Sequence, residues 1–147
     1  MEKYLLIQII ITGIFLGICT YIDLKRKYVN IYICLIFSIA GVMYKCIFEN
    51  STLLSLLVAI IPGIFLMLVS IISKESIGKG DAIVIGTIGL YIGGINAVIV
   101  LFSGVIASCI TGIIYIVIMK KEKGYRLPFV PFLTLGFIYQ IVNGSLV

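Results

Sequence analysis

The chain has 147 residues, of which 62% are hydrophobic and only 12% are charged, and its formal net charge is +5 at pH 7. Soluble domains carry about 25% charged residues, so this composition excludes an ordinary soluble fold and indicates a protein whose solvent is lipid. The basic residues lie in short loops between apolar segments, a distribution that argues against a nucleic-acid-binding patch and predicts no nucleic-acid partner.

A membrane-spanning helix needs about 20 apolar residues, so the chain has room for about six spans and no sizeable soluble appendage. The expected helices cover residues 4–22, 30–48, 52–73, 81–92, 97–119 and 128–143. The first is interpreted as a retained helix, because no small-residue cleavage site of a signal peptide follows it. Asn30 is the predicted N-cap of the second helix, and Pro62 is expected to kink the third. The predicted fold class is all-α: a polytopic membrane protein with a six-transmembrane-helix bundle.

The distribution of Lys and Arg predicts the orientation of the bundle. Nine basic residues follow the first, third and fifth helices: Lys25, Arg26, Lys27, Lys74, Lys79, Lys120, Lys121, Lys123 and Arg126. The opposite side carries only Lys3 and Lys45. Because cytoplasmic loops are enriched in Lys and Arg, both termini are expected outside and the three basic loops in the cytoplasm.

The fourth helix is expected to be unusually short. From residue 82 to residue 92 it would rise only about 16 Å at 1.5 Å per residue, about half of the hydrocarbon thickness. Either the helix starts earlier, through Gly78 and Gly80, or its start is sunk into the membrane. Both alternatives place Asp81 at or below the cytoplasmic surface. Glycine-rich backbone at that depth is tolerated only where it lines a wet cavity or is covered by protein.

Metal and cofactor chemistry has little support in the sequence. The chain contains no histidine, and its four cysteines, Cys19, Cys34, Cys46 and Cys109, stand alone in apolar segments without a C-x-x-C pair. We therefore expect no metal site and no cofactor. All four cysteines are predicted to be buried as small apolar side chains.

The chain contains only two aspartates, Asp23 and Asp81, and both are expected at cytoplasmic helix ends. Taken singly, Asp23 is typical of a solvated acid beside basic residues, and Asp81 is typical of a helix N-cap. Taken together they favour a functional pair, because ionisable residues near membrane depth are costly and usually functional. Two carboxyls that share a proton can activate water and polarise a peptide carbonyl.

Three segments, in order along the chain, resemble motifs of the bacterial type IV prepilin peptidase family. Gly78-Lys79-Gly80-Asp81 matches the G-x-G-D motif of intramembrane aspartyl proteases, and the segment 23–30 resembles the family's other aspartate motif. The segment 127–136 is similar to the Pro-Phe-rich segment that opens the last helix. The chain departs from the family at Tyr28-Val29, where Ile-Pro is usual, and at Val130, where glycine is frequent. It resembles the compact form, which lacks the zinc-binding, methyltransferase-associated insertion.

The resemblance implies a membrane-embedded aspartyl endopeptidase, a single peptidase domain over 1–147 in the bacterial inner membrane. Its partners would be the lipid bilayer and a prepilin or pseudopilin precursor, whose leader is cut at the cytoplasmic boundary; the sequence indicates no particular oligomeric state. The implied catalytic residues are Asp23 and Asp81, with Gly78, Lys79 and Gly80 as the active-site loop. The implied supporting residues are Asn30, Pro128, Phe129 and Pro131.

Two other interpretations remain open at this point. A small transporter or channel also uses buried acids and glycine-broken helices, although no internal repeat is evident between the two halves. A presenilin-like or signal-peptide-peptidase-like protease shares the G-x-G-D motif, but the Pro-Ala-Leu element of that group is absent from this sequence.

Overall fold

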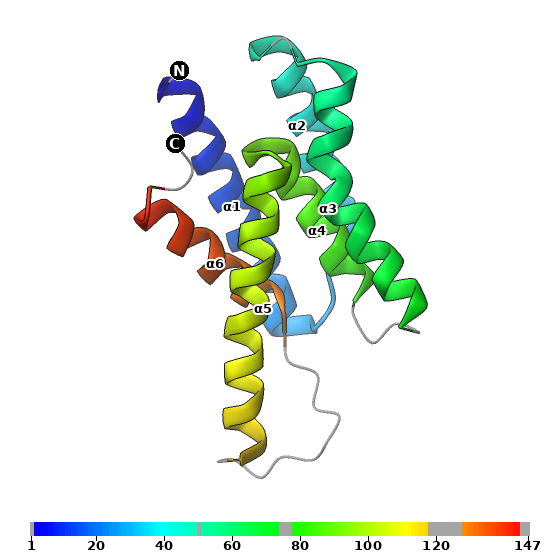
Figure 1. Ribbon diagram of the computed structural model, residues 1–147, viewed down its shortest axis with the longest axis vertical. Coiled ribbons are helices and arrows are strands. Elements are labelled where there is room, and N and C mark those ends of the chain that lie inside the picture. Colours follow the sequence, from blue (N-terminus) through cyan, green and yellow to red (C-terminus); the bar gives the residue numbers. More distant parts are fainter. Residues whose placement is uncertain (1, 50, 74–77, 118–127, 145–147) are drawn as a thin grey trace.

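A computed structural model of the chain describes residues 2–49, 51–73, 78–117 and 128–144. The described residues form six helices and no strand, which confirms the predicted all-α fold (Figure 1). In chain order they are α1 (Glu2–Arg26), α2 (Ile31–Phe48), α3 (Leu53–Ile72), α4 (Lys79–Ile92), α5 (Gly94–Val117) and α6 (Val130–Val142).

The helices differ in their capacity to cross a bilayer. Among the described residues, α1, α2, α3 and α5 are long and apolar enough to span the membrane. The helices α4 and α6 have only 14 and 13 residues, short of the roughly 20 that a full span needs. The expected shortness of the fourth helix is therefore confirmed. The four long apolar helices establish a multi-pass membrane protein.

Next to the aspartates, the predicted end of the first helix was wrong, and the start of the fourth helix agrees with one of the two alternatives. The first helix continues to Arg26 rather than ending at residue 22, so Asp23 lies inside the last turn of α1 and not in a loop. The helix α4 starts at Lys79 with Gly78 as its N-cap, which is the earlier of the two starts that the sequence left open. Both results arise because polar residues at a helix end still form backbone hydrogen bonds, which apolar patterning does not reveal.

The remaining helix boundaries differ from the prediction at the starts of α5 and α6 and agree with it at the start of α2. Gly93 alone, with φ of 85°, turns the chain between α4 and α5, so α5 begins at Gly94 rather than at residue 97. Pro128 lies outside α6, which starts at Val130. The helix α3, in which a kink at Pro62 was expected, runs without interruption through that residue. Asn30 is confirmed as the N-cap of α2, since its side chain accepts a hydrogen bond of 3.0 Å from the backbone N–H of Tyr32.

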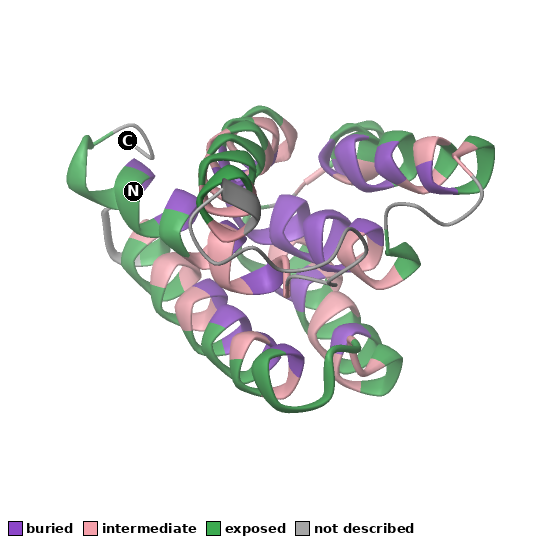
Figure 2. Ribbon diagram, turned by 90° about the horizontal axis from the view of Figure 1, so that it is seen from below, coloured by how far each residue is buried: buried purple, intermediate pink, exposed green. Residues whose placement is uncertain are grey.

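The short helix α4 occupies the centre of the molecule. It packs against α1, α2, α3 and α5, and its residues from Val84 to Ile92 are all buried. The surrounding helices turn buried residues inward and exposed residues outward (Figure 2). A helix too short for the bilayer is thus covered by protein, which satisfies the condition for placing its ends at membrane depth.

Glycines bring α3 and α4 into close contact. A Cβ atom at Gly89 would lie 2.0 Å from the carbonyl oxygen of Ala59, and one at Gly63 would lie 2.6 Å from the Cα of Gly86. Small residues of this kind let two helix backbones approach closely, which is how helices associate where lipid removes the hydrophobic driving force.

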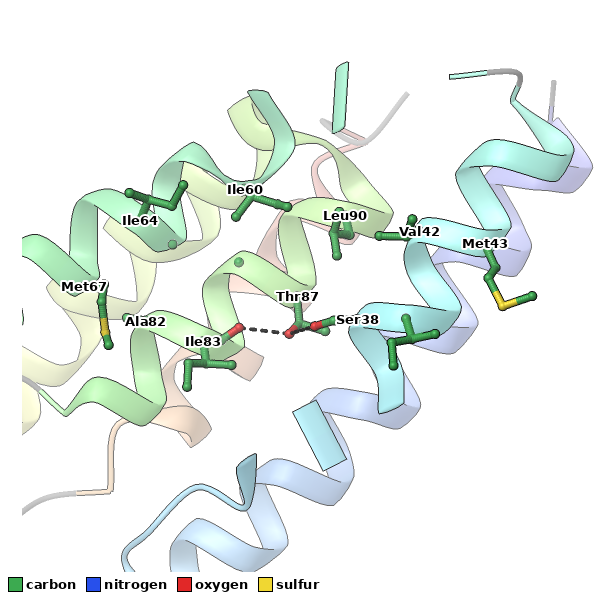
Figure 3. A pocket seen from close by; sticks show the side chains of 13 residues that line it. Ser38, Val42, Met43, Ile60, Ile64, Met67, Ala82, Ile83, Thr87 and Leu90 are labelled. Carbon is green, nitrogen blue, oxygen red and sulfur yellow. Dashed lines mark hydrogen bonds between the residues drawn. The ribbon is translucent and has the colours of Figure 1, made fainter. Parts of the chain in front are cut away.

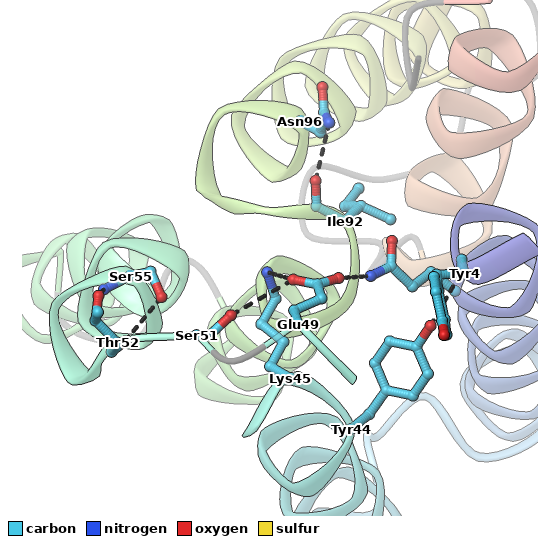
Figure 4. A network of polar contacts seen from close by, with 10 residues as sticks. Tyr4, Tyr44, Lys45, Glu49, Ser51, Thr52, Ser55, Ile92 and Asn96 are labelled. Atoms are coloured by element: carbon cyan, nitrogen blue, oxygen red, sulfur yellow. Dashed lines mark hydrogen bonds and ion pairs between the residues drawn. The ribbon is translucent and has the colours of Figure 1, made fainter. Parts of the chain in front are cut away.

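Polar contacts join α1 and α2 at the end of the bundle where α1 begins (Figures 1 and 4). Glu49 accepts hydrogen bonds from Gln8 and from Lys45, the latter at 3.2 Å. The hydroxyl of Tyr44 donates to the backbone carbonyl of Tyr4 at 3.0 Å. These contacts lie at the opposite end of α1 from Asp23.

The prediction for the cysteines holds for two of the four. Cys19 and Cys34 are buried, whereas Cys46 and Cys109 are exposed on α2 and α5. The prediction failed for the latter pair because it equated apolar with buried. On a helix that faces lipid, an apolar side chain gains little from turning inward.

Candidate active site

The Asp23 carboxyl is buried and faces the start of α6. Its Oδ2 accepts a hydrogen bond of 3.1 Å from the backbone N–H of Val130, and the backbone N–H of Phe129 donates to the same carboxyl. The first N–H groups of a helix have no partner inside that helix. Asp23 therefore supplies the acceptor that the start of α6 lacks, and α6 in turn orients Asp23.

Asp81 lies in the first turn of α4 and is half-buried. Its backbone N–H donates to the carbonyl of Gly78 at 3.1 Å, and its side chain turns back toward the same glycine. A Cβ atom at Gly78 would lie 2.9 Å from the Asp81 Oδ2. Any side chain at position 78 would thus compete with the carboxyl for its place.

The fold brings the two aspartates to the same region. The helices α1 and α4 pack against each other, and the charge of Asp23 acts on the carboxyl of Asp81. This proximity arises from packing alone, since two whole helices, α2 and α3, separate the two positions in the sequence. Two acids near one another beside a protein-covered helix end are candidates for a pair that shares one proton, as catalytic carboxyls do.

The loop that follows α1 packs against the start of α4. The backbone N–H of Lys27, a residue with φ of 54°, bonds to the carbonyl of Asp23 at 2.8 Å and ends the helix. The chain then passes over the start of α4, where a Cβ atom at Gly80 would lie 2.6 Å from the Cβ of Val29. A glycine at position 80 is therefore required by this approach.

The remaining predicted site residues differ in exposure and in their contacts with the two acids. Gly78 and Lys79 are exposed, while Gly80, Asn30, Pro128, Phe129 and Pro131 are half-buried. Phe129 contributes a backbone donor to Asp23, and Pro131 lies in the first turn of α6. Within the described residues, no group of three or more His, Cys, Asp and Glu side chains could hold a metal ion.

Sequence reasoning missed two parts of the site. The first is Val130, whose contribution is a backbone N–H that no sequence pattern marks. The second is the hydrogen bond of 2.7 Å between the hydroxyls of Thr20 and Thr134, which joins α1 to α6. Thr20 precedes Asp23 by three residues, so helical spacing places both on one face and could have indicated it.

A family model for the type IV leader peptidases matches residues 10–117. The chain belongs to the type IV leader peptidase family. It is a peptidase of the class that acts on prepilin-like substrates, and this membership favours an enzyme over a transporter or channel. The match includes both aspartates, Asn30 and the segment 78–81, whereas the Pro-Phe-rich segment lies beyond it. No curated protein and no solved structure matches the chain.

Gly80→Ala in this leader peptidase is expected to lower the rate of precursor cleavage by about ten- to a hundred-fold, since misplacing a catalytic group by about 1 Å costs on the order of a hundred-fold. The added methyl would push Val29 and the first turn of α4 apart. The double variant Gly80→Ala/Val29→Gly removes the opposing Cβ and should recover much of the rate. Full activity in Gly80→Ala, measured on the purified protein, would contradict a site that depends on this contact.

Asn30→Ala is expected to lower the free energy of unfolding by about 1 kcal/mol, the usual cost of losing an N-cap. It should also lower the rate of cleavage, because Asn30 directly follows Val29, which contacts Gly80 at the start of α4. Thr52 offers a matched control: it caps α3 by accepting from the N–H of Ser55 at 3.4 Å, at the opposite end of α2 (Figure 4). Thr52→Ala should lower the free energy of unfolding in detergent by a similar amount and leave cleavage unchanged. Equal losses of cleavage in the two variants would show that Asn30 has no particular role at the site.

Proposed function

We propose that this leader peptidase is an aspartic-type endopeptidase that uses Asp23 and Asp81 to remove the leader of prepilin or pseudopilin precursors. The observation that carries the proposal is that the only two aspartates of the chain lie on packed helices, near enough to interact electrostatically, in a member of a peptidase family. The G-x-G-D segment at residues 78–81 supports the same assignment, because it matches the motif of intramembrane aspartyl proteases.

In the proposed mechanism one carboxyl is ionised and the other protonated, with a water molecule held between them. The ionised carboxylate takes a proton from water as the oxygen attacks the peptide carbonyl, and the protonated carboxyl donates to the carbonyl oxygen. Collapse of the tetrahedral intermediate breaks the C–N bond. The leaving amine takes up the proton that the first carboxyl received, and one hydroxyl proton of the intermediate returns to the second carboxylate as the carbonyl re-forms, so both carboxyls regain their starting states. The products are a leader carboxylic acid, which ionises in water, and a new N-terminal amine.

The proposed place of cleavage is the cytoplasmic boundary of the bacterial inner membrane. In this proposal the short helices α4 and α6 are the remaining two of the six expected membrane-spanning helices. Lys25, Arg26 and Lys27 follow Asp23 directly, and basic residues of this kind mark cytoplasmic loops. The start of α1 and the end of α6 lie toward the same side of the bundle, in agreement with both termini being outside (Figure 1). The leader of the precursor would then approach from the cytoplasm, with its following apolar helix in lipid.

The test is cleavage of a prepilin-like precursor by the purified protein in phospholipid vesicles, with mass spectrometry of both products. The expected cut falls between the basic leader and the apolar helix, and excess metal chelator should leave the rate unchanged. Absence of cleavage, with ion flux across the same vesicles, would overturn the proposal in favour of transport. Dependence on an added divalent cation would overturn the aspartic mechanism.

A further inference from the structure

A groove with a volume of about 510 Å³ lies between α2 and α3 on the surface of α4 (Figure 3). Met43 of α2 and Met67 of α3 lie on its two sides, and its floor runs along α4 from Ala82 to Leu90. The exposed atoms of its lining are almost all apolar. In a bilayer such a groove is a surface for apolar molecules that arrive from within the membrane.

The groove starts beside the candidate active site. Ala82 and Ile83, which line one end of it, directly follow Asp81 in α4. From Ala82 to Leu90 the floor extends about 12 Å along the helix axis at 1.5 Å per residue, which is about two helical turns. A segment in this groove would thus run from the acids toward the interior of the membrane.

The hydroxyl groups in the groove are already paired with each other. Thr87 donates to the carbonyl of Ile83 at 2.9 Å, and its oxygen is joined to the hydroxyl of Ser38 at 2.8 Å (Figure 3). Among the described residues that line the groove, both hydroxyls are thus engaged before any occupant arrives. The methionine side chains of the groove, Met43 and Met67, are unbranched and adapt to different apolar shapes, as methionines do on surfaces that bind many helices.

We propose that this groove binds the apolar helix of the precursor during cleavage, so that the peptidase recognises the membrane-embedded part of its substrate between α2 and α3. This inference rests on the proposed function, because it requires the scissile bond to lie at Asp81. The occupant is a helix because backbone polar groups in hydrocarbon must be satisfied within their own segment. The start of the groove at Ala82, the residue next to Asp81, favours the substrate over a lipid chain.

Two pairs of isoleucines provide matched positions for a test. Ile39 and Ile64 line the groove and are 54% and 51% exposed. Ile36 and Ile61 precede them by three residues on the same two helices, do not line the groove, and are 63% and 53% exposed. Within each pair, residue type, helix and exposure are close to equal, but only the later residue lines the groove.

The binding experiment places a benzophenone amino acid at each of the four positions in the full chain, in vesicles, with a precursor kept intact by Asp81→Asn. We expect photo-crosslinks to the precursor helix at positions 39 and 64 and at least several-fold weaker ones at positions 36 and 61. Equal crosslinking at all four positions would overturn the proposal. So would crosslinks from 39 and 64 to lipid alone at saturating precursor.

The kinetic experiment uses the otherwise unaltered enzyme. Ile39→Trp and Ile64→Trp fill the groove and should raise KM about ten-fold with little change in kcat, as expected for lost binding that is uniform between ground and transition states. Ile36→Trp and Ile61→Trp should leave both constants within about two-fold. Cleavage that is indifferent to all four changes would overturn the groove alone. Absence of cleavage by the unaltered chain would contradict the proposed function, and this inference with it.

Discussion

Asp81→Asn and Asp23→Asn are each expected to reduce precursor cleavage to background, a loss of at least about 10²–10⁴-fold, which is the contribution typical of a positioned acid or base. Asparagine keeps the size of the side chain but cannot exchange a proton with water. In Asp23→Asn the amide oxygen of the new side chain could still accept from the N–H of Val130, so the start of α6 should remain in place. Cleavage is measured with the purified variants in vesicles.

The control for this experiment is Glu49→Gln, the same acid-to-amide change at the opposite end of α1 and α2. Glu49 is paired with Lys45 at 3.2 Å, and exposed pairs of this kind contribute only about 0–1 kcal/mol. We expect normal cleavage in Glu49→Gln and unchanged thermal unfolding in both aspartate variants. More than about a tenth of the normal rate in either aspartate variant would exclude a mechanism in which both acids transfer protons.

Gly89→Ala is expected to give the largest loss of stability of any single methyl addition considered for this chain. The new Cβ would lie 2.0 Å from the Ala59 carbonyl oxygen, which is backbone and cannot move aside without shifting α3. Overpacking typically costs about 1–3 kcal/mol, and contact with backbone places this change at the upper end of that range or beyond it. Thermal unfolding in detergent provides the measurement.

Gly86 offers the matched control, since it lies on the same helix and also faces α3. A Cβ atom there would lie 3.7 Å from the Cα of Gly63, an ordinary van der Waals distance. Gly86→Ala should therefore be neutral or stabilise α4 by up to about 1 kcal/mol through helix propensity. Similar melting temperatures for Gly89→Ala and Gly86→Ala would mean that α3 and α4 do not approach as closely as the structure indicates.

The interior of α4 illustrates why such contacts were not predictable from the sequence. Its glycines read as weak points of a helix, because glycine lowers helix propensity. In the structure Gly89 of α4 instead faces the carbonyl of Ala59 in α3, and Gly94 at the start of α5 likewise faces the carbonyl of Val58. A glycine that loosens a helix and one that admits a neighbouring backbone look the same in sequence. Only the partner distinguishes them, and the partner lies far away along the chain.

The candidate site likewise has features that could be recognised in the sequence and features that could not. The two aspartates and the G-x-G-D segment could be recognised from residue type and spacing, because few other acids occur in so apolar a chain. The donors that orient Asp23 could not, because they are backbone N–H groups that every residue except proline possesses. The position of Val130 opposite Asp23 follows from the packing of α6 on α1.

Composition and the lengths of apolar segments were sufficient to determine that this protein is a helical membrane protein, since the bilayer requires each spanning segment to satisfy its own backbone. That requirement is local and can be read along the chain. The burial of short α4 at the centre, the packing of α1 on α4 that brings Asp23 near Asp81, and the groove between α2 and α3 were decided only by tertiary structure. These features depend on which helices approach one another, and that choice is made by side-chain packing between segments distant in sequence.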